Sequence, residues 1–143
     1  MVTGWVDVLG SGTVRGIAVD QYAGTSGGLS SGLSIPLQQA YPAYQLLEYD
    51  NTSGTLTGFA IANLSLAQAT YNVTIWDING TQLLAQSITL PASGHTSAML
   101  PALFPVTGGQ RGLLQIQSSS PFAIVGVEAT GTGSLISVPP LFP

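Results

Sequence analysis

The stretch GLLQIQSSSPFAIVGVEA, residues 112–129, decides the fold, because its pattern also occurs near the start of the chain as GWVDVLGSGTVRGIAVDQ, residues 4–21. When Trp5 is set on Leu113, apolar positions meet apolar ones and polar positions meet polar ones, through two strands joined by a Gly/Ser-rich turn. After a longer first loop the match continues from LSIPL at 33–37 to LISVPP at 135–140. An internal repeat of this kind indicates one structural unit that is used more than once.

The repeat predicts how the chain is divided. Residues 1–40 are expected to be the C-terminal part of a first module, consisting of a hairpin, a Gly/Ser loop and a strand. Residues 41–143 are expected to form a second β-sandwich module, packed with the first as one unit. A chain of this length buries roughly 70% of its unfolded surface, so it needs no disulfide or metal to fold.

The whole chain is predicted to be all-β, because short β-rich runs are interrupted by turn residues at the spacing of a sandwich or barrel. Asn79-Gly80 predicts a hairpin closed by a type I′ turn. LPALFP at 100–105 predicts a single helical turn. The predicted strands lie at 4–9, 14–22, 31–38, 43–50, 55–64, 70–78, 82–90, 94–99, 111–118, 122–130 and 134–139.

Charged residues are unusually few. The 143 residues include two arginines, no lysine and six acids, for a net charge of −4, and there is no cysteine. Nucleic-acid binding requires clustered Lys and Arg, so the composition excludes that class. It also argues against an anionic membrane surface. A polar surface made of Ser, Thr, Asn, Gln and Gly is typical of extracellular or cell-surface β proteins, which is the localisation we predict.

No membrane insertion is expected. The strongest apolar run, FAIVGV at 122–127, is far shorter than the ~20 residues of a helical span. The start of the chain, MVTGWVDVLG, lacks the basic and apolar regions of a signal peptide.

Several segments together resemble a known group of proteins. GWVDVLGSGTVRGIAV, TGFAIANLS, VTIWDINGTQL with SITLPASGHTSAML, and RGLLQIQSSSPFAIVGVEATG with SVP resemble the tandem β-sandwich modules of secreted, cell-surface proteins from acidobacterial-type environmental bacteria. The resemblance spans nearly the whole chain. It implies an immunoglobulin-like antiparallel β-sandwich, and it implies no particular activity.

Catalytic signals are weak, and we predict that the chain is not an enzyme. GLSSG at 28–32 matches the G-x-S-x-G pattern, but that pattern presents its serine, here Ser30, only where a strand turns into a helix. His95 is the only imidazole, and a surface or hydrogen-bonding role is expected for it. With one histidine and no cysteine, no zinc or copper site and no cofactor are predicted.

Two places in the sequence have some features of a calcium site. Asp77 and Asn79 in DING resemble the start of a calcium loop, but apolar residues follow where further ligands are needed, so a hairpin is the better interpretation. Glu48 and Asp50 alternate along LLEYDN and remain a weak alternative. No pair of carboxylates stands out as an acid–base couple.

The sequence has candidate sites both for binding carbohydrate and for covalent glycosylation. Four aromatic residues, Tyr41, Tyr44, Tyr49 and Trp76, form a candidate sugar-binding platform, although aromatic residues in a sandwich usually belong to the core. Four sequons are candidate glycosylation sites, at Asn51, Asn63, Asn72 and Asn79.

The absence of lysine matters most for the strand edges, which β proteins usually protect with charge, proline or bulges. Both ends of the chain are also apolar. We therefore expect an extracellular structural protein that assembles with copies of itself into a surface filament or fibre, by strand-edge pairing. The alternative is a carbohydrate-binding or adhesion module of a larger secreted protein. The expected assembly interface comprises Val2, Trp5, Val138, Leu141 and Phe142.

Overall fold

The computed structural model describes residues 5, 6, 8, 11, 16–23, 29–37 and 41–141, with the backbone alone at 20–23, 29–31 and 41–43. Its strands are β1 (Ile17–Ala23), β2 (Leu29–Pro36), β3 (Tyr41–Asp50), β4 (Leu56–Asn63), β5 (Ala69–Asp77), β6 (Gln82–Leu90), β7 (His95–Met99), β8 (Arg111–Ala129) and β9 (Leu135–Val138). One helical turn, α1 (Leu100–Leu103), and a 3-10 turn at Pro105–Thr107 lie between β7 and β8. The all-β prediction is confirmed, as is the helical turn. Trp5, Val6 and Val8, within the strand expected at 4–9, are not in a strand.

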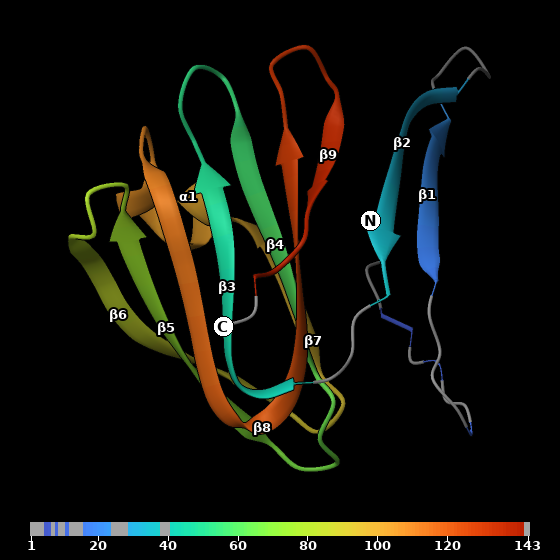
Figure 1. Ribbon diagram of the computed structural model, residues 1–143, viewed down its shortest axis with the longest axis vertical. Coiled ribbons are helices and arrows are strands. Elements are labelled where there is room, and N and C mark those ends of the chain that lie inside the picture. The colour runs from blue at the N-terminus through green and yellow to red at the C-terminus, as the bar shows by residue number, and fades with distance from the viewer. Residues whose placement is uncertain are drawn as a thin grey trace.

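Strand β8 organises the antiparallel body of the molecule (Figure 1). Its first half pairs with β3 on one side and β5 on the other, and β5 then pairs with β6. Its second half pairs with β4 and β9, and β4 then pairs with β7. One 19-residue strand therefore belongs to two four-stranded layers.

The sequence predicted two strands joined by a turn in this segment. The chain does reverse direction there, but residues 111–129 form one continuous, sharply bent strand instead of two separate ones. At the SSSP stretch the strand bends back on itself and changes partners, so its two halves run in opposite directions (Figure 1). Ser118 donates its hydroxyl to the carbonyl of Thr70 at 2.8 Å and accepts the N–H of Ser120 at 3.1 Å. Pro121 has no N–H to leave unpaired. The pairing of β3 with β8 also shifts register here.

The hydrophobic core lies between the two layers. Tyr71 of β5 contacts Phe122 of β8 edge to face, with ring centroids 5.3 Å apart. Phe59 of β4 stacks on Phe104, which follows α1, at 6.1 Å. The other fully buried apolar side chains come from both layers and α1: Leu47, Ile61, Val73, Ile75, Leu100, Leu114, Ile116 and Ile124. In β5 alternate residues face this core, as period-two patterning requires.

Gly126 shows how closely the layers approach. A Cβ on this residue would lie 2.7 Å from a methyl carbon of Leu47 and 3.0 Å from Val138. Leu47 belongs to β3 and Gly126 to the far half of β8, so the glycine lets the two layers close against each other.

The hairpin at Asn79-Gly80 is confirmed, but its turn type differs from the prediction. Gly80 has a φ of 79°, whereas Asn79 is not among the positive-φ residues, so the turn is not type I′. The Gly80 N–H donates to the carbonyl of Asp77, and Asp77 N–H donates to the carbonyl of Thr81, which is the pattern of a type I turn followed by a glycine bulge. The Asp77 carboxylate accepts the N–H groups of Asn79 and Thr81, so a hairpin turn accounts for DING.

Strands β1 and β2 form a separate two-stranded hairpin, which lies beside β9 (Figure 1). Its register reproduces that of the hairpin formed by β8 and β9. Val19 faces Ser34 in the first hairpin, and Val127 faces Ser137 in the second. Within the described ranges, no helix has the length and apolar character needed to cross a membrane.

Candidate functional site

Two surfaces are candidates for function, and the first is a groove on the outer side of the β5–β8–β3 layer. Its volume is about 770 Å³. Cross-strand pairing builds its floor, because Trp76 lies opposite Leu113 and Leu46 lies opposite Gln115. The lining comprises Tyr44, Leu46, Glu48, Tyr49, Asp50, Trp76, Asp77, Ile78, Gly80, Arg111, Gly112, Leu113, Gln115 and Glu128.

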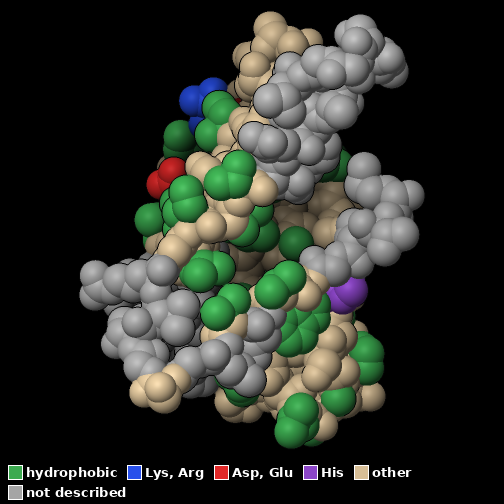
Figure 2. Space-filling view, turned by 90° about the vertical axis from the view of Figure 1, so that its right-hand side faces the viewer, with side chains coloured by type: hydrophobic (Ala, Val, Ile, Leu, Met, Phe, Trp, Pro, Cys, Tyr) green, Lys and Arg blue, Asp and Glu red, His purple; other side chains and the backbone are tan. Residues whose placement is uncertain are grey.

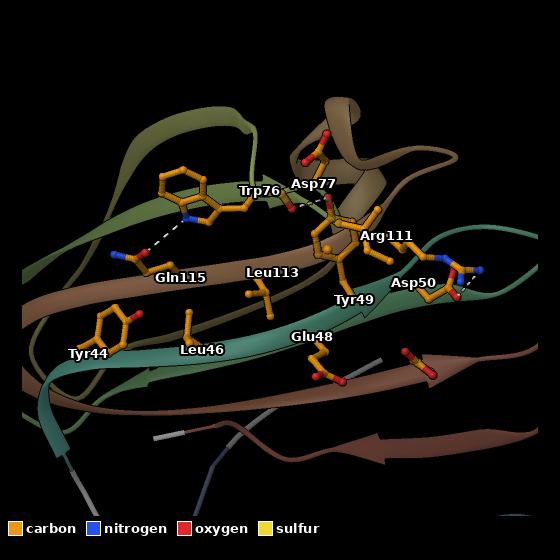
Figure 3. Close-up of a pocket in the computed structure, with 14 residues that line it drawn as sticks. Tyr44, Leu46, Glu48, Tyr49, Asp50, Trp76, Asp77, Arg111, Leu113 and Gln115 are labelled. Atoms are coloured by element: carbon orange, nitrogen blue, oxygen red, sulfur yellow. Dashed lines mark hydrogen bonds and ion pairs between the residues drawn. The ribbon is translucent and has the colours of Figure 1, made fainter. Parts of the chain in front are cut away.

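Aromatic and amide groups occupy one end of the groove. Figure 3 shows Trp76 and Tyr44 on opposite sides of Gln115. The indole N–H of Trp76 donates to Oε1 of Gln115 at 3.3 Å. The hydroxyl of Tyr49 lies beside the backbone of Trp76 and donates to its carbonyl at 3.2 Å. These two bonds hold Trp76 from its side chain and from its backbone.

Charged groups occupy the opposite end (Figure 3). Nη2 of Arg111 lies 3.2 Å from a carboxylate oxygen of Asp50 and also donates to Thr52 Oγ1 at 3.0 Å. Both ionic side chains are substantially exposed, so this ion pair contributes little stability. The pKa of Asp50 is lowered, first by the hydroxyl of Thr52, which donates to it at 2.6 Å. The carboxylate of Asp50 is thus already supplied with hydrogen-bond donors.

Glu128 lies where a negative charge is unfavourable. Burial raises its pKa, and the negative charges of Asp50 and Glu48 raise it further. No three acids or histidines among the described residues form a group that could hold a metal ion. The alternative of a calcium site at Glu48 and Asp50 gains no support from this arrangement.

The other residues singled out from the sequence are dispersed. Ser30 lies in β2, not at a strand-to-helix turn, and its side chain is outside the described part. His95 begins β7 and is exposed, with Ala62 opposite it in β4. The side chain of Tyr41 is also outside the described part, while Tyr44, Tyr49 and Trp76 all line the groove.

The four sequons fall into two pairs. Asn51 and Asn63 are buried. The side-chain amide of Asn51 donates to the backbone carbonyl of Thr107. That of Asn63 donates to the backbone carbonyls of Ala67 and Pro91. A glycan on either amide would have to displace these bonds, so burial does not fit glycosylation there. Asn72 and Asn79 are exposed, and for them glycosylation stays a prediction.

The second candidate surface is the outer edge of β1. The Leu37 N–H donates to the carbonyl of Gly16, which lies directly opposite, so this is a hydrogen-bonded pair. Hydrogen-bonded and non-hydrogen-bonded pairs alternate in an antiparallel ladder. The backbone N–H and C=O groups of Ile17 and Val19 therefore point away from β2. Among the described strands, none pairs with β1 on that side.

This edge is also apolar. Ile17 is 64% exposed and Val19 is 60% exposed. Figure 2, which views the molecule from the hairpin side, shows hydrophobic side chains around a hollow. Large exposed apolar groups gathered on one face mark a surface that binds another molecule.

Three of the five residues predicted to form an assembly interface, Trp5, Val138 and Leu141, lie in the described part of the chain. The Trp5 indole donates to the carbonyl of Ser93 at 3.2 Å. Val138 packs against the core, and the backbone of Leu141 forms a two-bond bridge with Leu46 on β3. Val2 and Phe142 lie outside the described residues. Leu141 is 44% exposed, whereas Ile17 and Val19 of β1, which the sequence did not indicate, are exposed further.

Comparison with known proteins adds no family assignment. No protein-family model matches the sequence, and no curated protein matches it at a significant level. Function must therefore be inferred from the two surfaces themselves.

Proposed function

We propose that this protein is an extracellular structural module with an immunoglobulin-like β-sandwich fold, and that copies of it associate by strand addition at the outer edge of β1. One observation carries the proposal. The hairpin of β1 and β2 has the register of the hairpin formed by β8 and β9, but none of the described strands lies beside β1 in the way that β4 lies beside β8. A second copy can supply that strand.

The pairing pattern supports the immunoglobulin-like part of the proposal. In that fold one sheet contains a B–E pair and the other a C–F pair, with C′ beside C in variable-type domains. Here the pair of β4 and β7 corresponds to B and E, and the neighbouring strands β6, β5 and β8 correspond to C′, C and F. The corresponding strands follow one another along the chain in the same order. The passage of β8 from one layer to the other departs from the usual topology.

Strand addition is supported by the exposed backbone of Ile17 and Val19. Each unpaired N–H and C=O of an exposed strand edge can be satisfied by a partner strand, and burial of the two apolar side chains adds a favourable term. The chain has no lysine with which to protect such an edge. Repeated without closure, the contact produces a fibre.

Val19→Pro tests the proposal. It removes a backbone donor on the outer edge and leaves the bonds between β1 and β2 intact, because Val19 is in a non-hydrogen-bonded pair with Ser34. Val19→Thr is the matched control, since it keeps the backbone donor and a β-branched side chain. Sedimentation velocity over a wide concentration range measures association, and negative-stain electron microscopy detects filaments.

We expect the wild type and Val19→Thr to associate as concentration rises, and Val19→Pro to remain a monomer of 14.6 kDa. Thermal unfolding of the body should be the same in all three. A wild type that stays monomeric at every concentration contradicts the proposal. Equal association of wild type and Val19→Pro also contradicts it.

A further inference from the structure

We propose that the groove across β5, β8 and β3 is a binding site for a neutral oligosaccharide of pyranose rings, with one ring held between Trp76 and Tyr44. The groove lies on the outer face of one layer, whereas the assembly edge lies on the separate hairpin, so this inference is independent of the proposed function.

The aromatic end fits the apolar face of a pyranose. A sugar ring presents a patch of C–H groups on one face, and aromatic rings carry negative charge density on theirs, so the two attract and exclude water. Trp and Tyr supply this contact area at small entropic cost, because each has two side-chain torsions. Trp76 is already fixed by Gln115 and through its own backbone carbonyl, so binding orders it little further.

The floor supplies hydrogen bonds for the sugar hydroxyls. Oε1 of Gln115 accepts from Trp76, which fixes the orientation of the amide and leaves its NH₂ group as a donor toward the groove. Within the described part of the chain, that NH₂ group makes no hydrogen bond. The exposed carboxylate of Glu48 provides acceptors further along the groove. A few fixed polar groups among apolar side chains are the usual composition of a small-molecule site.

Charge selects a neutral sugar over an acidic one. The lining includes the four acids Glu48, Asp50, Asp77 and Glu128 but a single cation, Arg111. Arg111 is already paired with Asp50 at 3.2 Å. An anionic glycan such as a polyuronate would meet net repulsion throughout the groove, and like-charge contacts are a strong source of specificity.

The length of the groove indicates an oligosaccharide and not a single sugar. The aromatic end and the charged end are separated by Leu46 and Leu113, which form an apolar floor between them (Figure 3). A volume of about 770 Å³ lies within the range of sites that enclose ligands of several rings.

Isothermal titration calorimetry of the full chain tests the inference, with cellohexaose, N-acetylated chitohexaose and mannohexaose as neutral probes and hexagalacturonate as the acidic probe. At least one neutral probe should bind, and hexagalacturonate should not. Trp76→Ala should weaken binding about thirtyfold or more, the effect of losing a central aromatic contact. Gln115→Ala should weaken the same probe without altering thermal unfolding, which keeps the test valid if Trp76→Ala folds poorly.

Two control variants separate this site from the rest of the molecule. Trp5→Phe should bind as the wild type does, and it leaves Trp76 as the only tryptophan, so any fluorescence change on binding reports the groove. Val19→Pro should also bind the neutral probe as the wild type does, because the groove does not include β1. The sugar-binding inference can therefore hold even if the assembly proposal fails. The inference is overturned if no neutral probe binds, if folded Gln115→Ala binds unchanged, or if hexagalacturonate binds as tightly as the neutral sugars.

Discussion

Two buried tyrosines should respond oppositely to loss of their hydroxyl groups. The ring of Tyr71 is completely buried, and its hydroxyl oxygen has no hydrogen-bond partner among the described residues. A buried polar group without a partner costs about 1–3 kcal/mol of stability. Tyr71→Phe removes that group and keeps the ring against Phe122, so we expect the protein to gain about 1 kcal/mol, the lower end of the range, because a small void remains.

Tyr49→Phe is the matched control. Tyr49 is also buried, with 3% of its surface exposed, but its hydroxyl donates to the carbonyl of Trp76 at 3.2 Å. Removing a satisfied hydrogen bond of this kind costs about 1 kcal/mol. The same chemical change should therefore separate the two variants by about 2 kcal/mol.

Urea unfolding followed by tryptophan fluorescence measures the free energy of unfolding of each variant. The slope of this free energy against urea concentration should be the same for the wild type and both variants. Thermal unfolding should show a rise of about 3 °C for Tyr71→Phe and a fall of similar size for Tyr49→Phe. If Tyr71→Phe destabilises the protein as much as Tyr49→Phe, the reasoning from hydrogen-bond satisfaction is refuted.

Two further predictions concern β8. Gly112→Ala should lower the free energy of unfolding in urea by about 3 kcal/mol or more, because the new Cβ would overlap the backbone carbonyl of Trp76, which cannot rotate away. Gly131→Ala is the control. Its Cβ would meet only ordinary contacts, so it should leave the stability nearly unchanged. Glu128→Gln should raise the melting temperature at pH 7, since burial and two nearby carboxylates raise the pKa of Glu128 and penalise its charge. That gain should decline as pH falls through the raised pKa and vanish below the ordinary value of 4.5; a gain independent of pH would contradict it.

The strands were largely predictable because their signal is local. Alternation in YNVTIWD places Tyr71, Val73 and Ile75 on one face, and all three are in the core. The chain reverses direction at SSSP as predicted, but the expected break between two strands is missing for a non-local reason. Serine and proline usually mark a turn that separates two strands. Here Ser118 also bonds to Thr70 of a neighbouring strand, a contact that the sequence does not display, and strand structure continues through the bend.

The groove was predictable only in part. The sequence named Tyr41, Tyr44, Tyr49 and Trp76 as a candidate platform, and the last three of these line the groove. It did not indicate Gln115 or Leu113, since their place beside Trp76 depends on the pairing of β5 with β8. Register between strands distant in sequence is a property of the assembled sheet, so no local pattern reveals it.

The two copies of the repeated pattern show that exposure is set by topology and not by the residues themselves. Val127 and Val19 occupy matching positions, opposite Ser137 and Ser34. Val127 is half-buried because β4 lies on its other side, with Gly58 directly opposite. Val19 has no such neighbour among the described strands and is 60% exposed.

A strand that completes β1 should resemble β4, which presents the small residues Gly58 and Ala60 to β8. Strand β6 is an edge strand of the body and has the exposed small residues Ala85 and Ser87 at alternate positions. We therefore expect β6 of a second copy to pair with β1. Ala85→Arg should weaken association at least tenfold in sedimentation experiments, because a bulky, charged side chain would meet Val19. Unchanged association of this variant, with Val19→Pro still monomeric, would mean that another edge supplies the partner strand.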